Sequence, residues 1–173
     1  MSDVRLIEAP LDIGFEIENV NSVEFEREYI QLSEADNDAI AQWLRNAKGK
    51  GEMGDSDGIV VQLLVELYRK IDRLEQALLH TAPKRIPLSN NAKIGRIGYE
   101  YFELLEPQLV SGTYYYGRLE MPVHPMREAG FYFEAQSPTL AKIVRMHQKD
   151  INEWGIYMMA RERAIIRHLK GYE

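Results

Sequence analysis

Six apolar residues recur along one stretch of this chain at alternating spacings of four and three positions. They are Val60, Leu64, Leu67, Ile71, Leu74 and Leu78. This spacing is the heptad repeat of a helix that packs against other helices along one seam. Asp55, Ser56 and Asp57 can cap the start of the helix, and Pro83 ends it. The stretch therefore predicts a long helix whose seam runs for nearly three heptads.

The heptad helix carries more apolar surface than a small domain can easily cover. Ile59, Val61, Leu63 and Val65 widen the apolar face in its first half. Leaving such a face in water is unfavourable by about 25 cal/mol per Å² of apolar area, and large exposed apolar patches mark interaction sites. We therefore expect a homo-oligomer. The alternative is a helix that packs only on its own domain.

A second, shorter helix is expected at residues 33–47. Ser33 is a good N-cap, and Glu34 and Asp36 place negative charge on the first turn. The apolar residues of this helix are Ile40, Trp43 and Leu44. Together, the two helices form a predicted oligomerisation segment at residues 33–82.

Alternating stretches on both sides of this segment predict strands. Residues 1–32 are expected to supply leading strands, because Ile13, Phe15 and Ile17 alternate with polar or small residues. After the helical segment the period changes to two in the stretches KIGRIGYEYF, TYYYGRLEM, AGFYFEAQ, AKIVRMH and WGIYMM. The final stretch, ARERAIIRHLKGYE, predicts an amphipathic helix. The fold class is therefore α+β, with residues 83–173 forming a small antiparallel barrel and a C-terminal helix.

Composition narrows the classes of function. The net charge is −6 and the pI is about 5.3, which argues against a broad electrostatic grip on nucleic acid. The chain has no cysteine, so disulfides and thiolate metal sites are excluded. No uncharged run approaches the roughly 20 residues that span a bilayer. We expect a cytoplasmic protein without membrane insertion.

Residues suited to catalysis are scattered along the chain. The four histidines are His80, His124, His147 and His168, and none has metal-ligand spacing with another histidine or an acid. The G-x-S-x-G, P-loop and dinucleotide motifs are missing from the sequence. We therefore expect no catalytic residue, no metal and no cofactor, and a small enzyme is kept only as a further alternative.

The elements of the C-terminal half follow a recognisable order over residues 92–170. A strand with a glycine that ends a short motif leads to a second strand, a proline-rich turn, further strands and an amphipathic helix. This order resembles the PilZ domain, the bacterial cyclic di-GMP receptor barrel. The segments 33–47 and 56–81 are similar to the helical insertion of the tetrameric PilZ subgroup, in which heptads hold the subunits together. The resemblance implies a homotetramer. The alternative is a homodimer, because the seam contains both β-branched residues and leucines.

PilZ domains bind their ligand partly through a (D/N)-x-S-x-x-G motif, which is incomplete here. With the motif glycine aligned on Gly98, Lys93 stands at the acid or amide position and Gly95 at the serine position. A carboxylate or amide accepts hydrogen bonds from a guanine edge, whereas lysine only donates them. The standard recognition of the base is therefore not expected.

The second ligand motif of the family, R-x-x-x-R, is also missing from its usual place before the barrel. The text match RKIDR, from Arg69 to Arg73, lies on the heptad helix, where arginines four apart usually form a solvated face. The segment that leads into the barrel offers only the adjacent cations Lys84 and Arg85. Adjacent cations do not make the spaced pair of guanidinium groups that clamps phosphates.

The resemblance implies a non-enzymatic protein of the cyclic di-GMP network, which governs motility, pili, biofilm or virulence. Such a protein would act by docking a protein partner that the sequence does not identify. The alternative is a genuine cyclic di-GMP receptor with a non-standard site. That site would be built from Lys84, Arg85, Lys93 and Arg96, with Gly98 beside them, because four cations near one strand can attract a dianion.

Overall fold

The computed structural model describes residues 4–34, 43, 46–47, 58–80, 84–122 and 127–171. The chain divides into two compact units. The barrel unit comprises residues 1–33 and 86–173, and the helical unit comprises residues 34–85. The helical unit is therefore an insertion in the sequence of the barrel unit.

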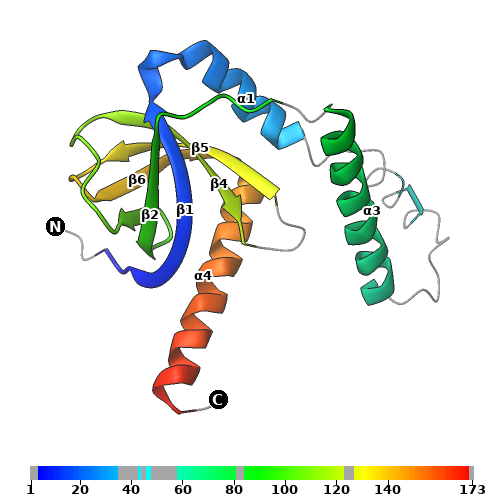
Figure 1. The fold of residues 1–173 in the computed structure, drawn as a ribbon. Coiled ribbons are helices and arrows are strands. Elements are labelled where there is room, and N and C mark those ends of the chain that lie inside the picture. Colours follow the sequence, from blue (N-terminus) through cyan, green and yellow to red (C-terminus); the bar gives the residue numbers. More distant parts are fainter. Residues whose placement is uncertain are drawn as a thin grey trace. The chain divides into compact units, whose positions relative to one another are not determined.

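Six antiparallel strands close into a barrel (Figure 1). They are β1 (Ile7–Ile17), β2 (Asn90–Ile97), β3 (Tyr101–Leu104), β4 (Tyr114–Met121), β5 (Arg127–Ala135) and β6 (Leu140–Met146). Their order around the barrel is β1-β2-β3-β6-β5-β4. The prediction of a small antiparallel barrel combined with helices is confirmed.

Aromatic rings fill the interior of the barrel. Phe102, Phe131 and Phe133 are fully buried, and Phe133 stacks on Tyr115 with ring centroids 5.2 Å apart. Gly117 on β4 gives these rings room, because a Cβ atom at this position would lie 3.0 Å from the Phe133 ring. Such dense packing of apolar rings is the main source of stability in a barrel of this size.

Two helices pack on the barrel. Helix α1 (Ser22–Glu34) follows the short 3-10 helix η1 (Glu18–Val20), and its Phe25 ring stacks on Tyr116 of β4 with centroids 4.8 Å apart. Helix α4 (Gln148–Leu169) packs its first half on the barrel through Trp154 and Met158, and its second half extends beyond the barrel (Figure 1).

The segment that leads to the insertion differs from the prediction. Residues 1–32 were expected to supply the leading strands of the barrel, but residues 22–34 form α1. Phe25, Tyr29 and Leu32 are the buried apolar residues of this helix, at helical spacings of four and three. Ser33 is not an N-cap. It lies in the last turn of α1, where its hydroxyl donates to the Ile30 carbonyl at 2.6 Å.

Two strand predictions in the C-terminal half are also wrong. The stretch WGIYMM lies within α4, because its buried residues Trp154 and Met158 fit a spacing of four as well as a spacing of two. The stretch KIGRIGYEYF is not one strand. It forms the end of β2 and the start of β3, joined by a tight turn in which the Gly98 N–H donates to the Tyr101 carbonyl at 2.7 Å.

Helix α3 (Gly58–Leu79) is the main described element of the helical unit. It ends at His80, whose φ of 54° is the left-handed conformation that commonly terminates helices. The predicted heptad helix is confirmed as a helix. Of the predicted helix at 33–47, the part between residues 35 and 47 lies outside the described residues, apart from residues 43, 46 and 47. None of the described helices is long and apolar enough to cross a membrane.

Candidate functional site

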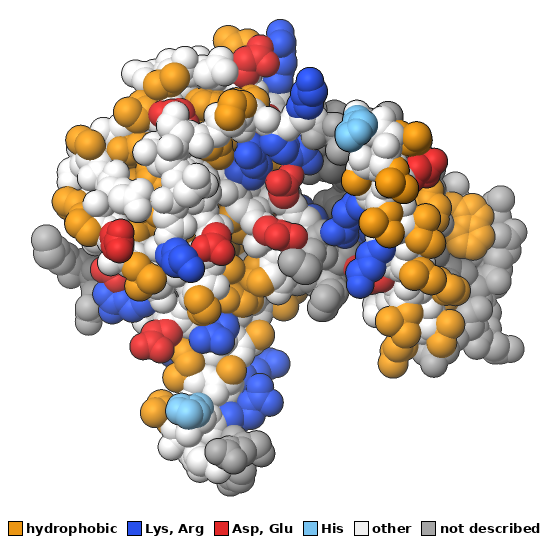
Figure 2. Space-filling model, in the orientation of Figure 1, with side chains coloured by type: hydrophobic (Ala, Val, Ile, Leu, Met, Phe, Trp, Pro, Cys, Tyr) orange, Lys and Arg blue, Asp and Glu red, His pale blue; other side chains and the backbone are white. Residues whose placement is uncertain are grey.

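The heptad seam of α3 is on the surface of the protein. All six predicted seam residues are more than half exposed, from 51% at Val60 to 80% at Leu78. Figure 2 shows the hydrophobic side chains that run along this helix. The half-buried residues of α3, Val61, Val65 and Gln76 among them, lie on another side of the helix. The covered side of α3 is therefore not the seam.

Further exposed apolar side chains lie beside the seam, and charged side chains flank it. Ile59, Leu63 and Tyr68 lie beside it and are 48% to 68% exposed. Charged residues such as Lys70 and Glu75 flank its second half. Helix α3 thus has an apolar stripe at three-four spacing between charged flanks. Helices with this pattern pack against other helices by knobs-into-holes packing.

Two of the residues considered for ligand binding have partners within the barrel. Lys93 on β2 is exposed, and its Nζ lies 4.0 Å from Asp12 Oδ1. The Gly98 carbonyl accepts a hydrogen bond of 2.8 Å from Trp154 Nε1. A Cβ atom at Gly98 would lie 2.8 Å from the backbone oxygen of Arg5. Packing against the N-terminal segment at Arg5 thus accounts for glycine at this position.

Arg96 on β2 has a different carboxylate partner from Lys93. Its guanidinium forms an ion pair with Glu103 on the neighbouring strand β3. The pairing of β2 with β3 is irregular between Ile94 and Arg96, which is where Gly95 lies. The side chain of Leu105 covers Gly95, because a Cβ atom there would lie 2.5 Å from it. Gly95 therefore also has a packing role.

The structure separates the predicted ligand residues. Lys93 lines one hollow on the barrel, whereas Arg96 lines another. Lys84 and Arg85 belong to the helical unit, and Gly98 belongs to the barrel unit with the other two. Within the barrel unit, the structure does not bring the predicted cations together in one hollow.

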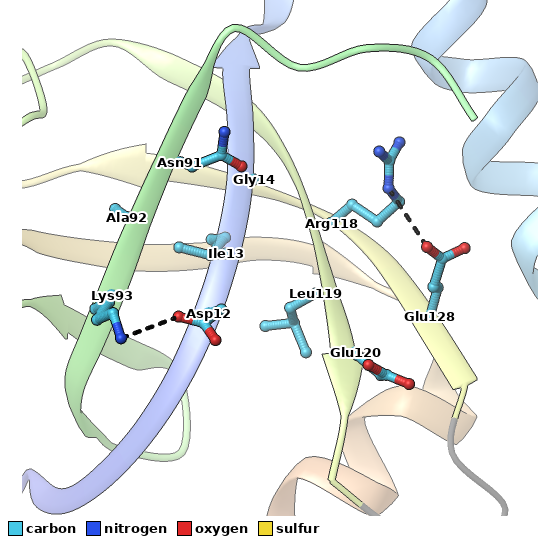
Figure 3. A pocket seen from close by; sticks show the side chains of 10 residues that line it. All are labelled: Asp12, Ile13, Gly14, Asn91, Ala92, Lys93, Arg118, Leu119, Glu120 and Glu128. Carbon is cyan, nitrogen blue, oxygen red and sulfur yellow. Dashed lines mark ion pairs between the residues drawn. The ribbon is translucent and has the colours of Figure 1, made fainter.

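The hollow beside Lys93 has a volume of about 490 Å³ and lies on β1, β2, β4 and β5 (Figure 3). Its two cations, Lys93 and Arg118, each have a carboxylate partner: Asp12 for Lys93, and Glu128 for Arg118, at 3.9 Å. Glu120 adds a third carboxylate to the lining. Because carboxylates outnumber cations here, the hollow is poorly suited to a phosphate-bearing dianion.

A buried carboxylate below α1 was not foreseen from the sequence. Glu28 is 3% exposed and accepts three hydrogen bonds: from Arg118 at 2.6 Å, from Tyr116 at 2.9 Å and from the backbone N–H of Ile86 at 2.7 Å. Burial, followed by the negative charge of Glu28, raises the pKa of Tyr116, so its hydroxyl stays protonated and donates. This cluster fastens α1 and the chain returning from the insertion to the barrel wall.

A second cluster fastens the other side of α1. Arg145 binds Glu26 through two hydrogen bonds of 2.6 and 2.9 Å, and its guanidinium lies 4.4 Å from the centre of the Tyr29 ring. His147 stacks on the same ring, and its Nε2 lies 2.8 Å from the Tyr29 carbonyl oxygen. His147 is thus engaged in packing. Both clusters are structural, and neither presents a nucleophile with a base beside it.

Among the described residues, no group of three or more histidines and carboxylates is arranged to hold a metal ion. Comparison with known proteins adds no assignment: no family model, no curated protein and no solved structure matches this chain. The exposed seam of α3 is therefore the most prominent candidate for a functional surface.

Proposed function

We propose that this protein is a non-enzymatic, self-associating protein of the PilZ type, which acts in cyclic di-GMP signalling through protein contacts. The observation that carries self-association is the exposed seam of α3, whose six residues are all at least 51% exposed. Covering the exposed part of each such side chain is favourable by roughly 1 kcal/mol. A second copy of the same helix is a suitable cover, because heptad seams are complementary to one another.

The order of elements supports the PilZ assignment. A closed antiparallel barrel is followed by a helix, α4, and the helical unit is inserted between β1 and β2. This is the order that the resemblance to the tetrameric PilZ subgroup implies, in which the helical insertion separates the first strand region from the rest of the barrel. The tetramer is accordingly the favoured assembly, and the dimer is its alternative.

The arrangement of charges supports action through protein contacts rather than standard nucleotide binding. Lys93 and Arg96 each have a carboxylate partner, and they line different hollows. Gly98 has a packing role against the backbone of Arg5. The barrel would then present a surface to a protein partner, in several copies held together by α3.

Light scattering tests the assembly. Leu67→Asp with Leu74→Asp places two carboxylates in the seam, where burying an unpaired charge costs several kcal/mol. We expect the mass to fall from a multiple of 20.1 kDa to 20.1 kDa. The matched control is Gln62→Asp with Lys70→Gln, which changes the charge of α3 by the same amount at exposed positions outside the seam. A wild-type monomer, or a folded double variant that keeps the wild-type mass, would exclude the seam as the interface.

Isothermal titration of cyclic di-GMP into the wild-type protein tests the second part of the proposal. We expect no saturable binding. Saturable binding that survives moderate salt would favour the receptor alternative, and Lys84, Arg85, Lys93 and Arg96 would then be replaced by glutamine one at a time. The oligomer and the nucleotide are separate measurements, so either part of the proposal can fail alone.

A further inference from the structure

Helix α4 has a second face that points away from the barrel. Its buried residues are Asp150, Trp154 and Met158, which repeat every four positions. The opposite side of the helix carries three apolar residues, Ile156, Met159 and Ile166, and three cations, Arg163, Arg167 and Lys170. The apolar residues are 45% to 61% exposed. These six residues are called the outer face of α4 below.

No carboxylate lies on the outer face within the described part of α4. The helix contains Asp150, Glu153 and Glu162. Asp150 and Glu153 both form ion pairs with Arg127 of the barrel, and Glu162 pairs with Arg5. The acidic residues of α4 are thus turned toward barrel arginines, which neutralise them, while the cations of the outer face point into solvent.

The charge of this helix end is opposite to that of the whole protein. Residues 161–170 contain four Lys or Arg and one Glu, a net charge of +3, in a chain whose net charge is −6. Cations in the last turn also suit the helix dipole, but that explanation does not cover Arg163 or the apolar residues. On the side of the protein drawn in Figure 2, basic and hydrophobic side chains lie together over the free end of α4.

We propose that the outer face of α4 binds the surface of an anionic membrane, with its aliphatic side chains at the headgroup level and its cations on lipid phosphates and carboxylates. Mixed cationic and aliphatic residues on one side of a helix suit such a surface. The negative charge of the rest of the protein opposes this only weakly, because salt screens charges beyond about 8 Å at physiological ionic strength.

The shape of the outer face favours a lipid surface over a protein. Binding to a protein partner concentrates its energy in a few anchors that fill pockets. The three hollows lined by Lys93, by Arg96 and by Trp154 include no residue of the outer face. A convex helix side of about 20 Å, from Ile156 to Lys170, can instead lie flat on a membrane without a pocket.

Sedimentation of the full-length protein with lipid vesicles tests the proposal. We expect binding to phosphatidylcholine vesicles that contain phosphatidylserine, weaker binding at higher salt, and no binding to pure phosphatidylcholine. Replacing Arg163 and Arg167 with glutamine is expected to weaken binding about 25-fold, or roughly fivefold per cation. Ile156→Ser with Met159→Ser is expected to weaken it as well, because the aliphatic contact is lost.

The control is Arg27→Gln with Lys142→Gln, which changes the net charge by the same amount at positions of the barrel unit outside α4. We expect this control to bind like the wild type, and light scattering on all variants checks that their assembly is unchanged. Failure of the wild type to sediment with anionic vesicles at low salt would overturn the proposal. So would an equal loss in the control, or binding to soluble polyglutamate without binding to vesicles, which would indicate an acidic protein partner. The result does not depend on self-association through α3.

Discussion

The barrel unit and the helical unit place their apolar side chains in opposite ways. In the barrel, the large apolar residues of the interior are each less than 9% exposed, and helices α1 and α4 cover further parts of the wall. In α3, no residue is buried, and the six seam residues are at least 51% exposed. The barrel can therefore be stable as a single chain, whereas α3 needs an additional surface to remove its seam from water.

The largest effect expected in the barrel concerns the buried Glu28. Glu28→Ala leaves the Arg118 guanidinium and the Tyr116 hydroxyl without their shared acceptor. Breaking a buried ion pair from one side costs about 3–5 kcal/mol. We expect the free energy of unfolding of the barrel, measured with urea, to fall by this amount in Glu28→Ala, with no dependence on protein concentration.

Glu24→Ala is the matched control for this measurement. Glu24 lies on the same helix, but it pairs with Arg27 in solvent, with 46% and 67% of the two side chains exposed. Exposed pairs contribute at most about 1 kcal/mol. Similar shifts for the two variants would contradict the view that burial makes the Glu28 cluster the main attachment of α1.

A smaller effect is expected at the junction of the barrel and α4. Gly98→Ala forces a Cβ atom against the backbone oxygen of Arg5, at 2.8 Å. Such overpacking typically costs about 1–3 kcal/mol. Gly155→Ala is the control, because a Cβ atom there meets nothing within 4 Å. In the interior of α4 this change should stabilise the protein by about 0.5–1 kcal/mol.

The two glycine variants also bear on the interpretation of Gly98. If its role is packing, thermal unfolding will show opposite shifts for Gly98→Ala and Gly155→Ala. An unchanged stability in Gly98→Ala would mean that packing does not require the glycine, and a ligand role would become the better explanation.

Dilution tests the comparison between the two units directly. If a second copy covers the seam, a tenfold dilution lowers the free energy of unfolding by at least about 1.4 kcal/mol for the transition that includes α3. The barrel transition should stay in place. Near-ultraviolet absorption of the buried barrel tyrosines follows the barrel, whereas circular dichroism at a helical wavelength follows α3 together with α1 and α4. The α3 transition is the part of the helical signal that moves with concentration. Identical transitions at all concentrations would mean that α3 does not depend on a partner.

The same contrast explains which features could be predicted from the sequence. The heptad seam depends on neighbours three and four positions apart, so it is visible in the sequence without the fold. The barrel strands are visible in the same way, because Tyr115, Leu119 and Met121 alternate along one strand. Contacts between distant segments leave no such local pattern. Glu28 and Arg118 lie 90 positions apart, and only the fold brings them together.

Helix α1 was missed for a different reason. Its buried residues Phe25, Tyr29 and Leu32 have helical spacing, but the short alternation at Ile13, Phe15 and Ile17 favoured strands for the entire leading segment. Sequence spacing alone also could not show whether the predicted ligand-binding cations form one site. Lys93 and Arg96 are near each other on one strand, yet each pairs with a different carboxylate.

The smallest expected effect concerns the exposed attachment of α1, the Glu26–Arg145 pair. The hydrogen bond from Arg145 lowers the pKa of Glu26 below its ordinary value of 4.5, although partial burial opposes this. A lowered pKa in the folded state means that the pair stabilises the protein at neutral pH, and that this contribution disappears as the pH falls through the folded pKa, below 4.5. Because both side chains are 41% or more exposed, the contribution should be less than about 1 kcal/mol.

The pH dependence of Glu26 must be measured as a difference between variants. Burial raises the pKa of Asp150, against the opposing effect of Arg127. The contribution of Asp150 to the stability of the protein therefore falls as the pH rises, which is opposite in direction to the contribution of Glu26. Subtracting the profile of Glu26→Gln from that of the wild type removes this contribution. We expect the difference to be small at neutral pH and to vanish in acid. A difference that grows in acid would contradict the assigned sign. A loss of unfolding free energy in Glu26→Gln as large as that in Glu28→Ala would mean that burial does not set the relative strength of the Glu26–Arg145 pair and the Glu28 cluster.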